Sequence, residues 1–246
     1  MNDFFALYDT LLEGVPDLPV LNTQSGDFWT GVETQEGLGL AMTTPGDTAP
    51  RMLPQFDDSL SLKELSQGVK SWNFAEAGYS MAAINAGYNT EVRLHQLQAQ
   101  EPFEHYCTRG LNLSGKRIGV VGHLNMPEFI RREAKEVWIL ERNPQPGDYP
   151  DSACEVLLPR CDVVLITAST LVNKTLPRLL ALCANAYTIL TGPTCPMCPA
   201  LLDMGLDRLS GLVITNRPGM KEKIVANLPG PPYPLGQPFL LTRERL

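Results

Sequence analysis

The sequence predicts an α/β protein in which a small α+β domain precedes a Rossmann-like, doubly wound parallel sheet. After about residue 110, continuous apolar segments alternate with helical ones, the pattern of a parallel sheet covered on both faces. Before that point, helical segments surround a hairpin and the alternation is absent. We therefore expect an α+β domain at 1–110, a Rossmann-like domain at 111–216 and a Pro-rich, irregular tail at 217–246.

Composition is that of an ordinary globular protein. The 246 residues are 43% hydrophobic and 19% charged, and the formal net charge is −7. This acidic balance argues against nucleic-acid binding, which needs clustered Lys and Arg. The N-terminus has acidic residues and no basic region, so it is no secretory signal, and no apolar run has the ~20 residues of a membrane span. We expect a cytoplasmic protein that contacts no membrane and keeps its six cysteines reduced.

The elements of the first domain follow from local patterns. Apolar residues at helical spacing predict a helix over 3–13. Aromatic and β-branched residues on both sides of a Gly-containing connector predict a hairpin within 28–44. Ser61 and Glu64 have capping-box spacing, so a helix should begin near Ser61. The segment 72–88 is rich in Ala and Gly and predicts a buried helix that packs closely against a neighbour.

The Rossmann-like domain should contain five strands. Apolar runs predict them at 115–122, 136–142, 161–170, 187–192 and 211–216. The intervening helices are expected at 127–134, 175–184 and 199–205. Because ligands of open parallel sheets bind beyond the carboxyl ends of the strands, the small and polar residues that follow these strands are candidates for a site.

A dinucleotide is the first ligand that this architecture suggests. Gly122 follows a strand, and Glu141 stands about 20 residues later, near the position of the ribose-binding acid in dinucleotide-binding proteins. The turn "GVVGHLNMP" lacks the third Gly of the fingerprint, and His123 and Leu124 occupy it. These bulky side chains hinder a close approach of pyrophosphate, so NAD is not expected. His123 itself is a candidate acid, base or metal ligand, or a loop histidine bonded to the backbone.

The stretch "LTGPTCPMCP" contains the Cys-x-x-Cys pair Cys195 and Cys198. Its position at a strand-to-helix turn predicts lowered thiol pKa values, which favour the metal-binding thiolate. The spacing suits two ligands of one soft metal ion, and His123 or another subunit would have to supply the rest of a tetrahedral site. Thiol–disulfide exchange and simple packing of the turn are the alternatives.

Three segments in order, "WNFAEAGYSMAAINAGYN", "ITASTLVNKTLPRLL" and "LTGPTCPMCPALLDMGLDRLSGLVIT", resemble the family known as putative heavy-metal chelation. The resemblance covers nearly the whole chain except the tail. It implies an enolase-N-terminal-like front domain, a Rossmann-like domain behind it, and a cleft between them that handles a metal or a metal-containing small molecule. Members commonly carry Ser, Thr or Leu where this chain has Cys195, Met197 and Cys198, so chelation by the cysteine pair would be specific to this chain.

Carried over by position, the resemblance implies a set of cleft residues with amide, hydroxyl and backbone groups for a polar ligand. These residues are Asn85, Asn89, Gly122, His123, Thr170, Asn173, Gly192, Pro193 and Thr194. The metal ligands, if the ion is bound directly, are Cys195 and Cys198.

The expected function is that of a cytoplasmic small-ligand-binding protein with an interdomain cleft that handles a soft transition or heavy metal, or a metal-containing small molecule. The first alternative is an enzyme that acts on a small nucleotide- or pterin-like substrate with His123 as acid or base. The second is a scaffold whose cleft is a docking surface. The Pro-rich tail is expected to lie across a partner subunit in a homodimer. The sequence sets neither the identity of the ligand nor whether the protein is catalytic.

Overall fold

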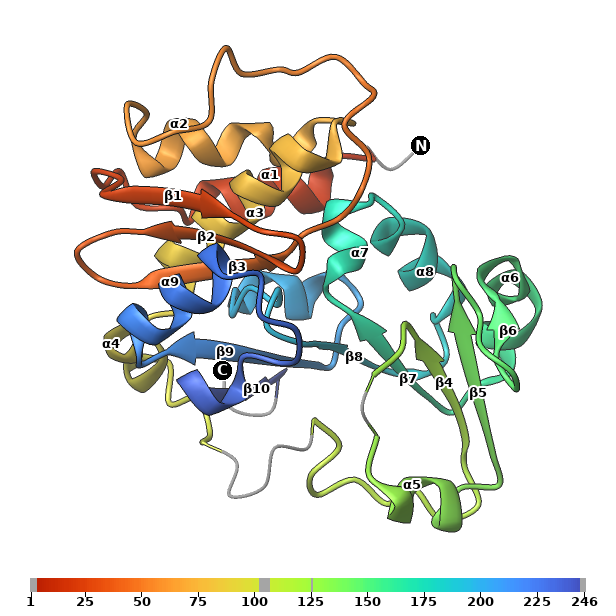
Figure 1. The fold of residues 1–246 in the computed structure, drawn as a ribbon. Coiled ribbons are helices and arrows are strands. Elements are labelled where there is room, and N and C mark those ends of the chain that lie inside the picture. Colours follow the sequence, from red (N-terminus) through yellow and green to blue (C-terminus); the bar gives the residue numbers. More distant parts are fainter. Residues whose placement is uncertain (1–3, 102–106, 125, 244–246) are drawn as a thin grey trace.

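Two β-sheets organise the chain (Figure 1). The computed structural model describes residues 4–101, 107–124 and 126–243. A three-stranded antiparallel sheet, here called the small sheet, lies in the N-terminal part, and a seven-stranded sheet, the large sheet, lies in the remainder. Within the described ranges, no helix combines the length and the apolar character needed to cross a membrane.

The N-terminal part contains the small sheet and the helices that cover it. The strands, in the order β1-β2-β3, are β1 (Asn22–Ser25), β2 (Trp29–Glu33) and β3 (Leu38–Met42). The helices are α1 (Ala6–Glu13), α2 (Leu62–Ser66), the 3₁₀ helix η1 (Gln67–Lys70), α3 (Phe74–Tyr88) and α4 (Glu91–Gln96). The predicted capping box is confirmed, because Ser61 accepts from the backbone N–H of Glu64 and the Glu64 carboxylate accepts from that of Ser61.

Helix α3 is buried around most of its circumference, as its small residues predicted. It lies directly against β3: a Cβ atom added to Gly39 would be 2.1 Å from the carbonyl oxygen of Ala82. A side chain at position 39 would therefore push the helix away from the sheet. Small residues on both partners allow this close approach, which places the C-terminal half of α3 between the small sheet and the rest of the molecule.

The large sheet confirms the Rossmann-like prediction. Its strands are β4 (Arg117–Val121), β5 (Glu136–Glu141), β6 (Tyr149–Pro150), β7 (Val163–Thr167), β8 (Tyr187–Thr191), β9 (Arg208–Ile214) and β10 (Gly236–Thr242). They are ordered β10-β9-β8-β7-β4-β5-β6, with β10 antiparallel to β9 and the other pairs parallel. The six parallel strands can be numbered by their order in the chain, from β4 as 1 to β9 as 6. Their order across the sheet, starting from β6, is then 3-2-1-4-5-6, which is the doubly wound order. The strand order reverses between β4 and β7.

Short helices connect these strands. They are α5 (Glu128–Glu133), α6 (Cys154–Leu157), α7 (Ser169–Val172), α8 (Leu176–Leu182) and α9 (Arg217–Val225), with the 3₁₀ helices η2 (Asp151–Ala153), η3 (Leu158–Arg160), η4 (Pro199–Met204) and η5 (Tyr233–Leu235). The expected helix at 199–205 is therefore a 3₁₀ helix.

The expectation of an irregular tail at 217–246 was wrong, because α9 and β10 are regular elements. Asn216 caps α9 by accepting from the backbone N–H of Gly219, and Pro218 stands in its first turn. Strand β10 tolerates Pro238 because it is the edge strand of the sheet. Met220 and Ile224 of α9 pack with side chains of the small sheet, so this segment joins the two sheets within one chain.

Candidate functional site

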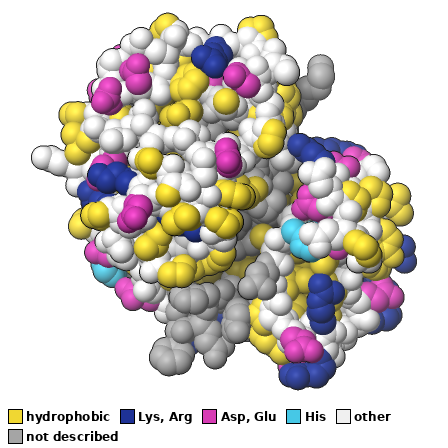
Figure 2. Space-filling view, viewed as in Figure 1, with side chains coloured by type: hydrophobic (Ala, Val, Ile, Leu, Met, Phe, Trp, Pro, Cys, Tyr) yellow, Lys and Arg dark blue, Asp and Glu magenta, His cyan; other side chains and the backbone are white. Residues whose placement is uncertain are grey.

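A cavity of about 900 Å³ lies between the small sheet and the carboxyl ends of the large sheet. Figure 2 shows the hollow between the two parts of the molecule, with hydrophobic side chains along one wall. The cavity is beside the point between β4 and β7 where strand order reverses, which is where open parallel sheets bind ligands. Its volume is within the range of small-molecule sites, roughly 300–1,000 Å³.

Seven of the nine residues expected to bind a ligand line this cavity. They are Gly122, His123, Thr170, Asn173, Gly192, Pro193 and Thr194. They come from the ends of three neighbouring strands: two follow β4, two lie in or just after α7, which follows β7, and three follow β8. The parallel arrangement of the strands brings these separate segments to one edge of the sheet.

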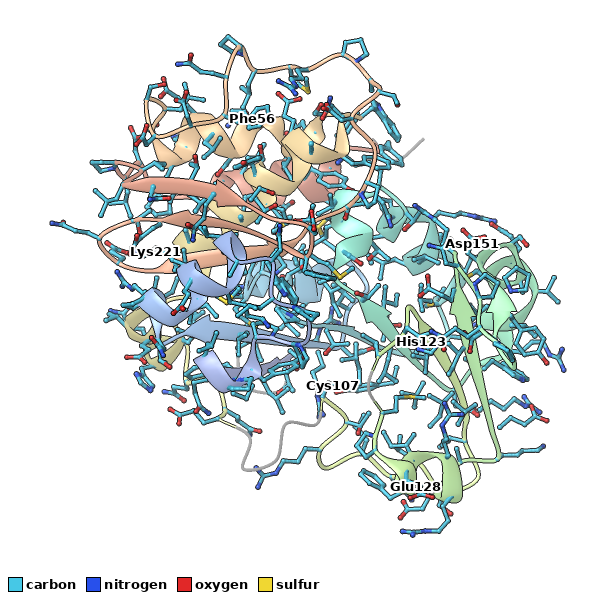
Figure 3. The ribbon with its side chains drawn as sticks, viewed as in Figure 1. Phe56, Cys107, His123, Glu128, Asp151 and Lys221 are labelled. Carbon is cyan, nitrogen blue, oxygen red and sulfur yellow. The ribbon has the colours of Figure 1, made fainter. Side chains whose placement is uncertain are left out.

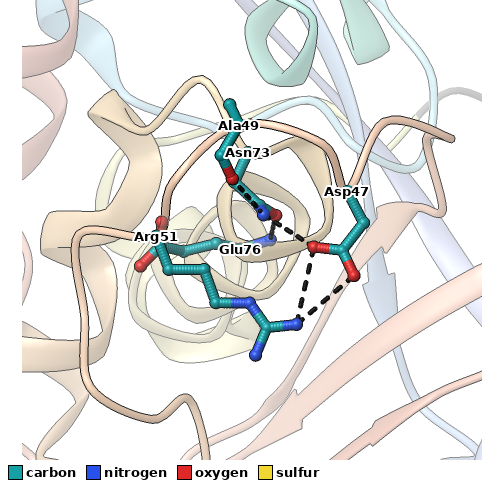
Figure 4. Close-up of polar contacts among 5 residues, drawn as sticks. All are labelled: Asp47, Ala49, Arg51, Asn73 and Glu76. Carbon is teal, nitrogen blue, oxygen red and sulfur yellow. Dashed lines mark hydrogen bonds and ion pairs between the residues drawn. The ribbon is translucent and has the colours of Figure 1, made fainter.

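The loop that follows β3 supplies the opposite wall through residues 43–45. The N-terminus of α3 fixes this loop (Figure 4). Asn73, the N-cap, donates to Asp47 at 2.6 Å, and the fully buried carboxylate of Glu76 accepts from the backbone N–H of Met52 at 2.9 and 3.0 Å. The polar residues that hold this loop carry no sequence motif.

Asn85 and Asn89 do not line the cavity, which corrects their expected position. Both are buried within α3 and its C-cap, at 0% and 2% exposure. Asn85 Nδ2 donates to the carbonyl oxygens of Leu40 at 2.6 Å and Thr194 at 2.9 Å. Asn89 Nδ2 donates to Cys195 O at 2.9 Å and to a carbonyl oxygen of β9. The two amides therefore join the small sheet to the loop after β8.

The Cys-x-x-Cys pair lies inside this junction rather than on the cavity wall. Cys195 and Cys198 are 0% and 2% exposed and belong to the main hydrophobic core. The Cys195 Sγ lies 3.4 Å from the carbonyl oxygen of Leu190. Burial raises the pKa of the Cys195 thiol above its ordinary value, opposite to the lowering that the strand-to-helix turn predicted.

A directly ligated metal ion does not fit the donor groups that the structure describes. Among residues 4–101, 107–124 and 126–243, no group of three or more His, Cys, Asp or Glu side chains is arranged to hold an ion. A soft metal in a tetrahedral site needs four such donors, at least three of them from the protein. The described donor groups therefore do not form such a site by themselves, and ligation by Cys195 and Cys198 stays a prediction.

His123 has a carboxylate partner that no sequence motif indicates. Its Nε2 lies 2.8 Å from Oδ2 of Asp148, whose side chain is 6% exposed. A hydrogen bond from the backbone N–H of Gln145, together with the one from His123, holds the pKa of Asp148 below its ordinary value. The ionised carboxylate accepts from Nε2–H, which leaves Nδ1 as the nitrogen able to take a proton. Figure 3 places His123 next to the end of β4.

Ion pairs and an apolar surface complete the cavity walls. Arg178 contacts Glu155 through both carboxylate oxygens, and Arg142 Nε lies 3.6 Å from Asp151 Oδ2. These four residues line the end of the cavity near β5 and β6. At the other end, apolar side chains dominate, from Trp29, Met42, Pro231, Pro232 and Tyr233. The last three belong to the segment expected to be an irregular tail, and no sequence motif indicates that they lie at a site.

Two solved structures resemble the whole chain. A protein of unknown function from the DUF364 family of Desulfitobacterium hafniense DCB-2 is 31% identical, with 98% of each chain covered and a TM-score of 0.84. A protein of unknown function from the same family of Pyrococcus horikoshii is 26% identical, with 97% of this chain and 99% of that chain covered and a TM-score of 0.79. No curated protein matches significantly.

Two family descriptions with the same wording, "Putative heavy-metal chelation", match residues 8–88 and 111–230. Together they cover both the small sheet and most of the large one. The second of them is the DUF364 description, so the sequence match and the structural likeness point to one family. The chain therefore belongs to the DUF364 family, described as "Putative heavy-metal chelation".

Proposed function

We propose that this protein binds a small metal-containing molecule in the cavity between the small sheet and the ends of β4, β7 and β8. The observation that carries the proposal is the position of this cavity of about 900 Å³, beside the reversal point of the large sheet and walled on its other side by the small sheet. The metal part of the proposal rests on the family description.

The chemistry of the walls suits an organic ligand better than a bare ion. The O–H of Thr194 and the Nδ2 group of Asn173 offer donors to a ligand, and the hydroxyl oxygen of Thr170 offers an acceptor. Trp29 offers an apolar face. Such a mixture orients a polar molecule and shields part of its surface from water. A chelated metal would be carried by that molecule.

The test is to identify what the purified protein carries. Protein prepared anaerobically is denatured, and the released small molecules are analysed by elemental and organic mass spectrometry. We expect near-stoichiometric metal together with an organic compound. Met42→Trp, which adds bulk at a half-exposed cavity wall, should abolish this content, whereas Val225→Trp, on the exposed face of α9 and off the cavity, should keep it. Empty wild-type protein, or equal content in both variants, would reject the proposal.

The His123–Asp148 pair favours a second candidate function, an enzyme that uses His123 as acid or base on a nucleotide- or pterin-like substrate. The test incubates the protein with purine nucleosides, their monophosphates and neopterin, and follows products by liquid chromatography and mass spectrometry. A general acid or base contributes about 10²–10⁴-fold, so His123→Ala should remove most of any turnover and Asp148→Asn part of it.

The matched control for this candidate is His95→Ala. His95 also faces a carboxylate, with Nε2 at 3.1 Å from Glu101, but this pair is exposed and does not line the cavity. Turnover should be unchanged in this variant. Turnover that survives His123→Ala, or its absence from the wild type, would leave simple binding as the function.

A further inference from the structure

Glu141 has a carboxylate oxygen available to a ligand in the cavity. The residue ends β5 and lines the cavity. Its Oε1 accepts from the backbone N–H of Arg142 at 2.8 Å and of Asn143 at 3.3 Å. These bonds fix the orientation of the carboxylate, and within the described residues no hydrogen bond or ion pair reaches Oε2. An ionised oxygen held in this way can accept from two donors.

Glycine at position 122 allows the end of β7 to lie close to the end of β4, next to this carboxylate. The register pairs Val121 with Leu140, so Gly122 and Glu141 are the next residues on adjacent strands. Gly122 has φ +97°, and a Cβ atom there would be 2.7 Å from Cγ2 of Thr167, at the end of β7. Glu141, Gly122 and Thr167 all line the cavity, at the ends of three adjacent strands around the reversal point.

The same turn is unfavourable for phosphate. His123 and Leu124 both line the cavity where a dinucleotide fold brings its glycines against the pyrophosphate. The helix that follows, α5, has six residues and contributes none of them to the cavity, and Figure 3 places its Glu128 well away from His123. Its N-terminal amides are therefore not available to a phosphate there, and the Glu141 carboxylate adds negative charge. The ligand is therefore expected to be uncharged at this end.

We propose that the ligand carries a ribose-type vicinal diol, which donates both hydroxyls to Glu141, and that it has no phosphate next to that diol. An ionised carboxylate at the end of the second strand is the group that binds such hydroxyls in sheets of this order. This inference rests on the proposed function, because it describes the ligand of the same cavity. Its chemical class is a metal-containing molecule with a nucleoside or related glycoside part, and metal-free nucleosides and ribosides can serve as probes of that part.

Calorimetric titration of the full chain, freed of any carried ligand, tests the diol. The probes are adenosine, 2′-deoxyadenosine, AMP and methyl β-ribofuranoside. Adenosine should bind about tenfold or more tightly than 2′-deoxyadenosine, which lacks one donor to a charged acceptor, and also more tightly than AMP. If methyl β-ribofuranoside binds with an affinity similar to that of adenosine, the protein recognises the sugar alone. If the riboside does not bind while adenosine does, the base contributes to the affinity as well.

Glu141→Gln is the matching variant, since it keeps the shape of the side chain and removes the charge. It should weaken adenosine about tenfold and leave 2′-deoxyadenosine nearly unchanged. The control is Glu136→Gln, which makes the same change at the exposed start of the same strand, off the cavity, and should leave adenosine affinity unchanged. Equal affinity for adenosine and 2′-deoxyadenosine, or an unchanged affinity for adenosine in Glu141→Gln, would overturn the proposal that Glu141 binds a diol.

The two proposals fail separately. Suppose that neither adenosine nor the riboside binds, while another compound is found in the wild type and lost in Met42→Trp. This result would overturn the proposal of a diol bound to Glu141 and would keep the cavity as the binding site. Adenosine binding that Met42→Trp leaves intact would contradict the cavity itself.

Discussion

Residues 192–194 and 195–198 are adjacent in the sequence and lie in opposite environments. Gly192 and Thr194 line the cavity, whereas Cys195 and Cys198 are buried in the core. The change of direction follows from α3, because Asn89 accepts from the backbone N–H of Met197 at 2.9 Å and donates to Cys195 O. The spacing of a Cys-x-x-Cys pair therefore does not decide whether it faces a ligand, and the elements packed around it do.

Asn173 and Lys174 are a second pair of adjacent residues that lie in different environments. Asn173 lines the cavity, and Lys174, with φ +66° and 3% exposure, turns into the core. Lys174 Nζ donates to the carbonyl oxygen of Val172 at 2.8 Å and lies 5.4 Å from the ring centroid of Tyr8. Burial lowers the pKa of Lys174 to about 7, although the nearby Glu76 carboxylate acts to raise it. At both places the buried residue holds the cavity wall in position.

The largest expected effect concerns Asn89. Asn89→Ala removes two donated and one accepted hydrogen bond and leaves their buried backbone partners unsatisfied. At roughly 1–3 kcal/mol each, the free energy of unfolding should fall by about 3 kcal/mol or more. Urea denaturation measures it. The control is Asn143→Ala, an exposed residue of the cavity wall, and a similar loss in both variants would contradict the junction role of Asn89.

The pH dependence of Lys174 comes next. Because its pKa is lowered in the folded protein, the unfolded chain binds more protons between about pH 7 and pH 10, so the free energy of unfolding rises with pH there. The rise is at most about 1.4 kcal/mol per pH unit and ends below about pH 7, where both states are protonated. The groups that face Lys174 are Glu76 and the rings of Tyr8 and Phe74.

Lys174→Met should remove this rise, as measured by denaturation of both proteins at a series of pH values. The exposed Lys116→Met is the control and should keep the wild-type slope. Parallel curves for the wild type and Lys174→Met would show that Lys174 is not buried as described.

A smaller effect is expected at Thr194. Its hydroxyl accepts from the backbone N–H of Met42 at 2.9 Å, which joins the cavity wall to the free edge of β3. Thr194→Val preserves the shape and should lower the free energy of unfolding by about 1 kcal/mol. Thr44→Val also alters a cavity-lining hydroxyl, but that group is exposed and should cost less than about 0.5 kcal/mol. Thermal or urea denaturation measures the free energy of unfolding of both variants. An equal loss in Thr194→Val and Thr44→Val would contradict the role of the Thr194 hydroxyl.

The last prediction concerns a reaction rate and not the free energy of unfolding: the reactivity of the cysteine pair. The thiolate is the reactive form, so burial and the raised pKa of Cys195 should make labelling by a disulfide reagent about 100-fold slower in native than in denatured protein. Mass spectrometry of the labelled peptides locates each site. Rapid native labelling of Cys195 or Cys198 would instead indicate that the loop opens and that the pair can reach a metal.

Much of the fold could be predicted because its signals are local. The continuous apolar runs identified β4, β5, β7, β8 and β9, and the capping box located the start of α2. Strand β10 and helix α9 were missed because their Pro and Gly neighbours suggested a loop. Edge position and the cap at Asn216, rather than composition, determine their structure.

Part of the cavity lining could be predicted for a similar reason. Residues directly after parallel strands reach one edge of the sheet whatever else the chain does, which is why Gly122, His123 and Thr170 line the cavity. Asp148, which contacts His123, stands far from it in sequence, in a loop without a motif. No sequence pattern could pair them.

The sequence by itself determined the large parallel sheet, its helices, and the polar strand ends, because hydrophobic periodicity and turn chemistry act over a few residues. The tertiary structure decided which way Asn85, Asn89 and the cysteines face, since that depends on how α3 packs between the two sheets. It also brought the loop after β3 and residues 231–233 to the cavity. A side chain's burial is set by partners distant in the chain, and local patterns carry no record of them.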